Sequence, residues 1–308
     1  MCAIAGLWSP RADPAEGVLQ AMAATMVHRG PDDGGTWIDA GTGLGLAHRR
    51  LAIVDLSPAG HQPMLSRCGR YAIAFNGEIY NHGALRAELE ALAGGVIEWR
   101  GHSDTETLLE AFAQWGFEAT LRRCVGMFAL ALWDREARVL QLARDRLGEK
   151  PLYYGHAANG DLVFASELKA FAALPGWSPE IDRQAVSLFM RYACVPAPWS
   201  IYRGIRKLEP GAMVRYDAAD AAPVAGRYWN ALSAIEAARA QPFSGSLQDA
   251  ADTLEKLLGD TIRLQSMADV PLGAFLSGGI DSSTVVALMQ KLGGAPVRTF
   301  SIGFNEEG

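Results

Sequence analysis

The sequence predicts an α+β domain of packed sheet and flanking helices, followed by the beginning of an α/β domain with a parallel sheet. Three apolar runs of strand length, at residues 71–75, 127–133 and 139–143, are bounded by glycine and polar residues. After residue 270, an apolar run leads through a glycine-rich turn into a second apolar segment of helical length. These two patterns divide the chain into regions of different architecture.

The length and composition are consistent with this division. The chain has 308 residues, of which 49% are hydrophobic, so it is long enough for two packed cores. We expect a first domain at residues 1–228 and a linker at 229–246, which is rich in alanine and contains Pro242 and Gly245. A second domain is expected at 247–308.

The individual elements follow from local patterns. Ser103 is a candidate N-cap, and Glu106 three residues later favours a helix that begins there. Its apolar stripe is expected to be core and consists of Leu108, Leu109, Phe112 and Trp115. In the second region, apolar residues recur at helical spacing from Leu247 onward. The runs at 270–276 and 284–289 are predicted to be a buried strand and a buried helix.

The charge pattern excludes several kinds of partner. The chain carries 34 acidic and 28 basic residues, a net charge of -6, with no basic block, so we expect no nucleic-acid partner. There is no signal-peptide pattern and no run of about 18 apolar residues, so we expect no membrane association and a cytoplasmic protein. The sequence fixes no oligomeric state and leaves a homodimer open.

The four cysteines differ in what they suggest. They stand far apart without a C-x-x-C pair, which disfavours zinc sites and disulfides, and Cys68, Cys124 and Cys194 are interpreted as packing residues. Cys2, in contrast, directly follows the initiator methionine. Loss of Met1 would give one residue both a thiol and a free α-amine, a nucleophile beside a base whose unperturbed pKa lies near neutrality. An incidental buried cysteine is the alternative interpretation.

The glycine-rich turn has the properties of a pyrophosphate site. Gly278 and Gly279 allow the backbone to approach an anion closely, and the hydroxyls and N–H groups at the helix start can donate to phosphate oxygens. No lysine ends the loop, which distinguishes it from the pattern G-x-x-x-x-G-K-[ST], and Asp281 offers a carboxylate to Mg²⁺. An ordinary glycine turn with a Ser or Asp helix cap is the alternative.

These features and several further motifs occur in an order that carries a family resemblance. The segments are 1–6, 28–32, 48–55, 75–81, 103–106, 144–148, 164–167 and 277–283. Essentially the whole chain resembles the glutamine-hydrolysing asparagine synthetases of the bacterial type, in which a class II glutamine amidotransferase domain precedes a PP-loop ATP-pyrophosphatase synthetase domain. The resemblance implies an N-terminal-nucleophile αββα sandwich followed by a parallel sheet.

The resemblance also implies a glutaminase site. Cys2 would attack the side-chain amide of glutamine with its own α-amine as general base, and the Asn76 side chain and the Gly77 N–H would stabilise the oxyanion. Arg50 would bind the α-carboxylate of glutamine, and Glu78 and Asp104 its ammonium. The implied glutamine site comprises Arg50, Leu51, Ala52, Ile53, Val54, Asn76, Gly77, Glu78 and Asp104.

Structural interpretations of these residues stay open. Asn76-Gly77 is also a common turn dipeptide, Arg50 could be a solvated surface residue, and Asp104 could cap the helix. His28 is interpreted as a structural residue near the pocket, because the α-amine already supplies a base.

For the second domain, the resemblance implies ATP as a substrate and Mg²⁺ on Asp281. The implied ATP site comprises Leu276, Ser277, Gly278, Gly279, Asp281, Ser282, Ser283 and Ile302. In this family, AMP is transferred to aspartate with release of pyrophosphate, and ammonia from the first site then forms asparagine. A shielded path for ammonia makes physical sense because ammonia is largely protonated in neutral water.

Other functions remain as alternatives. The acceptor could be another carboxylate, since no residue identified here contacts it, or the chain could act as a glutaminase only. A glutamine-sensing module without turnover is disfavoured by the intact set of Cys2, Asn76, Gly77 and Asp104. The loop at 277–283 excludes the phosphosugar-type amidotransferases. Because the family continues well beyond residue 308, we expect a second domain with unpaired strand edges, and synthetase activity that needs further chain.

Overall fold

The computed structural model describes residues 1–303. The last five residues of the predicted second domain, including Phe304, therefore lie outside the described part. Contacts within the chain divide it into two compact units, Met1–Leu232 and Ser233–Gly308, and each is considered by itself. No helix in the described residues is long and apolar enough to cross a membrane.

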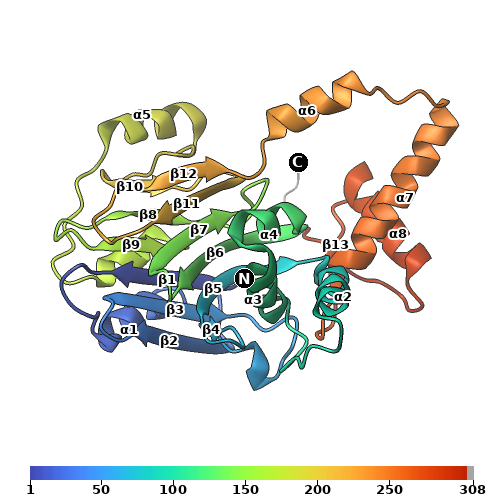
Figure 1. Ribbon diagram of the computed structural model, residues 1–308. Helices are drawn as coiled ribbons and strands as arrows, with labels where there is room; N and C mark the ends of the chain where they lie inside the picture. The colour runs from blue at the N-terminus through green and yellow to red at the C-terminus, as the bar shows by residue number, and fades with distance from the viewer. Residues whose placement is uncertain (304–308) are drawn as a thin grey trace. The chain divides into compact units, whose positions relative to one another are not determined.

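Two antiparallel sheets of six strands form the first unit (Figure 1). In sheet order, the first consists of β10 (Ile205–Lys207), β8 (Tyr153–His156), β9 (Leu162–Ala165), β1 (Ala3–Trp8), β3 (Leu44–Arg50) and β2 (Asp33–Asp39). The second consists of β12 (Val224–Arg227), β11 (Ala212–Tyr216), β7 (Val139–Arg144), β6 (Gly126–Asp134), β5 (Tyr71–Ile79) and β4 (Met64–Leu65). β5, β6 and β7 confirm the three strands predicted from the apolar runs.

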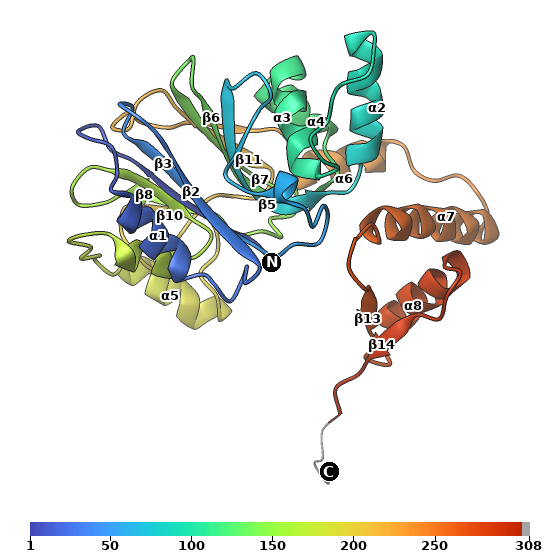
Figure 2. The same ribbon diagram turned by 90° about the horizontal axis from the view of Figure 1, so that it is seen from below.

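Helices cover the outer faces of both sheets (Figure 2). On the first sheet lie α1 (Glu16–Ala24), the 3-10 helix η2 (Leu168–Ala173) and α5 (Arg183–Tyr192), and on the second α2 (His82–Ala93), α3 (Asp104–Trp115) and α4 (Phe117–Arg123). A short 3-10 helix, η1 (Pro58–Gly60), follows β3. The resulting four layers confirm the αββα sandwich.

Alternation along the strands builds the three cores of this sandwich. On β1, Ile4 and Trp8 point between the sheets, whereas Ala3, Ala5 and Leu7 pack with α1. On β5, the inter-sheet residues are the small Ala72 and Ala74, and Ile73 and Phe75 pack under α3. The same period of two directs the side chains of Cys2 and Asn76 toward the space between the sheets.

The helix predicted at Ser103 is confirmed. The Ser103 side chain accepts a hydrogen bond from the Glu106 N–H at 3.3 Å, and α3 begins at Asp104. The predicted apolar stripe packs in the core beneath it, with Trp115 partly buried. The cysteines are only partly as expected, because Cys124 is buried but Cys68 and Cys194 are exposed.

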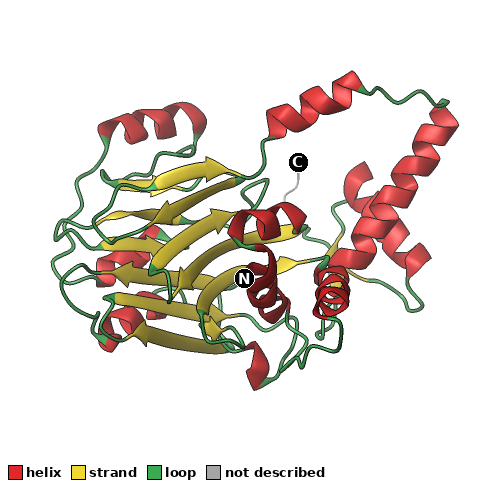
Figure 3. Ribbon diagram, viewed as in Figure 1, coloured by secondary structure: helices red, strands yellow, loops and turns green. Residues whose placement is uncertain are grey.

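In the second unit, helices dominate the described residues (Figure 3). The predicted linker 229–246 contains α6 (Ala231–Ala240), consistent with the high helix propensity of alanine. The amphipathic helix expected from Leu247 is α7 (Leu247–Gln265), which Ser246 and Asp249 close with a capping box. A strand, helix and strand follow in the order β13 (Gly273–Phe275), α8 (Ile280–Leu292) and β14 (Arg298–Phe300).

The strand and helix predicted to be buried in this unit are not. β13 has three residues and pairs in parallel only with β14 among the described strands, and Phe275 remains 78% exposed. No residue of α8 is buried. Apolar composition gives a segment the capacity for burial, but burial itself requires a partner surface, which the described part of this unit supplies for few of these side chains.

Candidate active site

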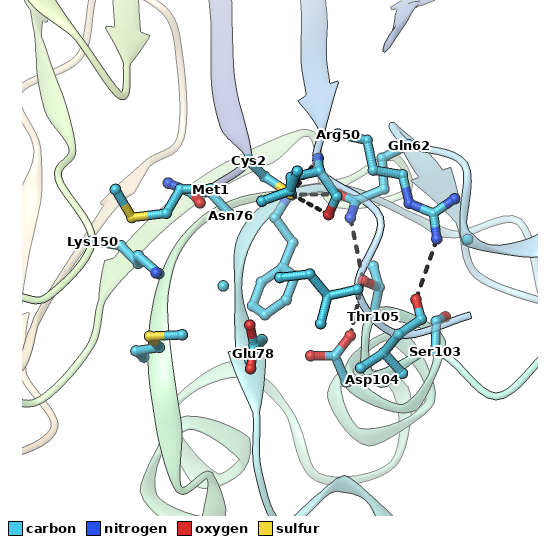
Figure 4. A pocket seen from close by; sticks show the side chains of 17 residues that line it. Met1, Cys2, Arg50, Gln62, Asn76, Glu78, Ser103, Asp104, Thr105 and Lys150 are labelled. Carbon is cyan, nitrogen blue, oxygen red and sulfur yellow. Dashed lines mark hydrogen bonds between the residues drawn. The ribbon is translucent and has the colours of Figure 1, made fainter. Parts of the chain in front are cut away.

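A cavity of about 220 Å³ lies where the start of β1 meets the second half of β5 and the first turn of α3 (Figure 4). Every residue predicted for the glutamine site lines it except Ala52. The lining also includes residues that sequence reasoning missed, namely Met1, Gly60, Gln62, Phe75, Ser103, Thr105, Met127 and Lys150. The fold thus brings together residues from seven separate parts of the sequence.

Cys2 presents its thiol at this cavity. Its Sγ accepts a hydrogen bond from the Leu51 N–H at 3.4 Å and lies 3.6 Å from the Leu51 carbonyl oxygen. Burial raises the pKa of the Cys2 thiol, so at neutral pH a base must remove the proton as the sulfur attacks. Burial also lowers the pKa of the N-terminal amine, which in this structure is that of Met1, and so favours its neutral form.

Arg29 fixes the backbone of the nucleophile. Its Nε donates to the Cys2 carbonyl oxygen at 3.1 Å, and its Nη1 donates to Glu167 Oε1 at 2.9 Å. His28 contacts the same Glu167 oxygen at 3.1 Å and does not line the cavity, consistent with its interpretation as a structural residue. These contacts restrict where the start of β1 can place its thiol.

Asn76 and Gly77 lie within β5 and not in a turn, which removes the turn alternative. The Asn76 side chain is 0% exposed, and neither its Nδ2 nor its Oδ1 has a hydrogen-bond partner among the described residues. Such orphaned amides are rare because an unsatisfied buried polar group costs about 1–3 kcal/mol. A Cβ on Gly77 would stand 2.3 Å from the Met127 carbonyl oxygen, so only glycine fits beside β6.

Arg50 is buried, which removes its interpretation as a solvated surface residue. Its guanidinium donates to the carbonyl oxygens of Ser57 and Val54, both at 3.3 Å, and to that of Asp55. A Cβ on Gly60 would overlap the guanidinium, so glycine is required there. The loop after β3 therefore holds a fixed positive charge at the cavity wall.

Two carboxylates supply negative charge at the cavity. Asp104 is the first residue of α3 and not its cap, and its Oδ2 accepts a hydrogen bond from the Ile79 N–H at 2.8 Å. Burial and, to a smaller extent, the neighbouring Glu78 carboxylate together raise the pKa of Asp104 to about 6, although the hydrogen bond from Ile79 acts to lower it. Burial also raises the pKa of Glu78. An ammonium group bound between them would relieve both costs.

Gln62 and Lys150 complete the cavity and were not predicted. Gln62 bridges two layers, because its Oε1 accepts from the Phe75 N–H at 2.7 Å and its Nε2 donates to Thr105 Oγ1 at 3.2 Å. Neither residue carries a local sequence pattern of its own. Only the proximity of Lys150 to the motif at 144–148 could have drawn attention to it.

The turn between β13 and α8 gathers the residues predicted for ATP. Ser277 and Ser282 hydroxyls are 3.0 Å apart, and Gly278 adopts a φ of +81°, a conformation that favours glycine. α8 begins after Gly279 without a side-chain cap, so the Ser or Asp cap alternative is not what forms. Asp281 is in the first turn. No group of three or more His, Cys, Asp or Glu side chains suited to a metal occurs in residues 1–303.

The flanking residues of this ATP set follow the carboxyl ends of the two strands. The Leu276 N–H donates to the Phe300 carbonyl oxygen at 2.8 Å, and the Ser301 hydroxyl bonds to the Leu276 carbonyl oxygen at 2.6 Å. Ile302 comes next along the chain. Parallel sheets bind ligands at this edge.

Two six-stranded antiparallel sheets between helical layers, with a cysteine leading into an inner strand, form the architecture expected for a glutamine amidotransferase domain. Glutamine phosphoribosylpyrophosphate amidotransferase from Bacillus subtilis shares this fold, with a TM-score of 0.54 and 18% identity over 97% of this chain and 65% of that chain. Residues 1–229 match the glutamine amidotransferase domain family, and residues 253–308 match the asparagine synthase family. The chain belongs to the glutamine amidotransferase domain family and carries part of an asparagine synthase domain.

Curated relatives agree with this assignment. A putative glutamine-hydrolysing asparagine synthetase of Mycobacterium tuberculosis is 38% identical over 100% of this chain and 47% of its own length. The glutamine-hydrolysing asparagine synthetase 3 of Bacillus subtilis is 35% identical over 94% of this chain and 45% of its own length. The chain spans about half the length of these relatives. The family resemblance found in the sequence is confirmed.

Proposed function

We propose that this chain hydrolyses glutamine to glutamate and ammonia at Cys2. The observation that carries the proposal is the fully buried amide of Asn76, which has no hydrogen-bond partner among residues 1–303 and lines the same cavity as the Cys2 thiol. Such a donor is available to an oxyanion that forms only during the reaction. A hydrogen bond that is stronger in the transition state than in the ground state accelerates the reaction. The Gly77 N–H would be the second donor.

The charges around the cavity match the substrate. Glutamine carries a carboxylate and an ammonium at one end, which Arg50 would bind on one wall and Asp104 and Glu78 on the other. Its side-chain amide would then reach Cys2. The thiol proton moves to the α-amine as sulfur bonds to the amide carbon. The α-ammonium then gives this proton to the leaving nitrogen as the oxyanion collapses, which breaks the C–N bond, releases ammonia and leaves a thioester. Water hydrolyses the thioester to glutamate and the free thiol.

Glutamate release by the purified protein tests this proposal. We expect activity in the wild type, none above background in Cys2→Ala, and none in a form that retains Met1 as shown by mass spectrometry. Cys68→Ala is the matched control, because Cys68 is also a free cysteine but is exposed and outside the cavity. Equal glutamate release by all four forms would show that Cys2 is not the nucleophile.

We further propose that the ammonia is used to convert aspartate to asparagine with ATP and Mg²⁺. The relatives' names and the asparagine synthase match support this assignment. The donor set of the turn fits a pyrophosphate, since it offers the hydroxyls of Ser277, Ser282 and Ser283 beside a helix N-terminus, with Asp281 for Mg²⁺. When bound there, ATP would activate the acceptor carboxylate and Mg²⁺ would neutralise phosphate charge.

The acceptor is tested by pyrophosphate release from ATP and Mg²⁺ with a panel of carboxylic acids. Release that depends on aspartate is expected. Release with a different acid in place of aspartate would favour another acceptor, and glutaminase activity with no release would restrict these residues to the first reaction. We also propose a cytoplasmic location, because a thiol nucleophile requires the reduced state that this compartment maintains.

A further inference from the structure

Lys150 is a buried cation that the mechanism described so far leaves unused. It follows β7 in the loop that leads to β8, is only 5% exposed and lines the same cavity as Cys2 and Glu78. Figure 4 shows its amine directed into this cavity. No hydrogen bond joins Lys150 Nζ to any residue that the structure describes. Because lysine is rarely buried to this extent, the position of its charge points to a role within the site.

The loop before Lys150 is built to hold it there. The Asp145 carboxylate, itself 0% exposed, accepts from the N–H groups of Leu147 at 3.1 Å, Glu149 at 2.9 Å and Lys150 at 3.0 Å. On the other side of the peptide, Arg144 Nε donates to the Lys150 carbonyl oxygen at 2.6 Å. These hydrogen bonds fix the backbone of Lys150 from both sides and so keep the residue at the cavity wall.

The charges around Lys150 and around the N-terminal amine can be compared directly. Glu78 on β5, Glu149 and Cys2 stabilise the ammonium of Lys150, and Arg29 opposes it. The N-terminal amine of this structure, that of Met1, lies near Arg29 and Lys150, which disfavour its protonation, and near Cys2 and Asp32, which favour it. Burial, the largest effect, and these two cations lower the pKa of the amine. Removal of Met1 would move the amine to Cys2, one residue closer to the sulfur.

We propose that Lys150 is a positioning residue of the glutaminase site, whose ammonium, held across from Glu78, keeps the α-amine at the start of the chain neutral and able to accept the Cys2 proton. The inference rests on the proposed function. It assigns the cation a task distinct from that of Arg50, which binds the substrate carboxylate at the other wall. Lys150 therefore acts on the rate of attack, and its charge also favours the ionised form of Glu78.

The pH profile of glutaminase activity tests this role. In Lys150→Met, loss of the positive charge should move the acid limb of kcat/KM to higher pH by roughly one pH unit, a tenfold loss below the midpoint that recovers at high pH. The pH shift should appear in kcat, in addition to any change of KM that the loss of charge beside Glu78 produces. Lys150→Arg keeps the charge and should keep the wild-type profile. Lys256→Met is the matched control, because that lysine side chain is 80% exposed on α7.

Several outcomes would overturn the inference. These are an acid limb in Lys150→Met that coincides with the wild type, an equal loss at all pH values, or a change confined to KM. If Lys150→Met does not fold, Lys150→Gln replaces it. A second measurement reports the protonation of the α-amine directly: the rate at which this amine is acylated is followed by mass spectrometry at each pH. Wild type and Cys2→Ala are measured alongside, so Cys2-independent activity would refute the proposed function, whereas an unshifted profile would refute only this inference.

Discussion

Replacing Asn76 by alanine should separate catalysis from stability. The side chain is fully buried, yet both of its polar atoms lack partners among residues 1–303. Loss of one oxyanion donor lowers kcat by about 100- to 1000-fold, equivalent to roughly 3–4 kcal/mol of transition-state stabilisation. The stability cost should be small, because removing an unsatisfied amide relieves about 1–3 kcal/mol of desolvation, which offsets the lost packing.

The assay compares glutamate release with urea unfolding in the same two proteins. For Asn76→Ala we expect kcat to fall by at least 100-fold, KM to change little, and the free energy of unfolding to stay within about 1 kcal/mol of wild type. Asn81→Ala is the matched control: Asn81 donates to the Arg123 carbonyl oxygen at 3.0 Å and accepts from the Val125 N–H at 2.9 Å. That variant should lose stability and keep its activity. Full activity in Asn76→Ala would refute the assignment of this amide to the oxyanion.

Two further predictions concern neighbouring residues. Gly77→Ala should lower the free energy of unfolding by about 1–3 kcal/mol in urea titrations, because the added Cβ would meet the backbone of β6. Gly83→Ala is the control and should cause no such loss, because an added Cβ there would have no neighbouring atom within 4 Å. Equal free energies of unfolding for the two variants would contradict this prediction. Asp104 has a raised pKa of about 6, so its ionisation destabilises the fold as pH rises from about 4 to 6, and Asp104→Asn should add up to about 3 kcal/mol at pH 7. Because the ionised carboxylate would bind the substrate ammonium, the KM for glutamine should fall in the wild type as pH rises through 6. In Asp104→Asn, the KM should be about 10- to 100-fold higher than in the wild type above pH 6 and should not change with pH. The same pH dependence of KM in both proteins would count against this role.

Much of the sandwich could be predicted because its patterns are local. The strands β5, β6 and β7 alternate or run apolar within nine residues or fewer, and the start of α3 depends on a side chain and an N–H group three residues apart. Such interactions are decided by neighbours along the chain. The second unit shows where this reasoning stops, since the apolar segments of β13 and α8 were expected to be buried and are exposed.

The sequence by itself determined the candidate nucleophile, the strands that carry the site and the family, because each depends on residue identity and short spacings. Only the tertiary structure decided that Asn76 has no hydrogen-bond partner in the described part of the chain, that carbonyl groups hold Arg50, and that Lys150 enters the cavity from a loop more than 140 residues beyond Cys2. Burial and the electrostatic environment depend on which distant segments pack together. Those contacts are set by long-range packing, which no local pattern encodes.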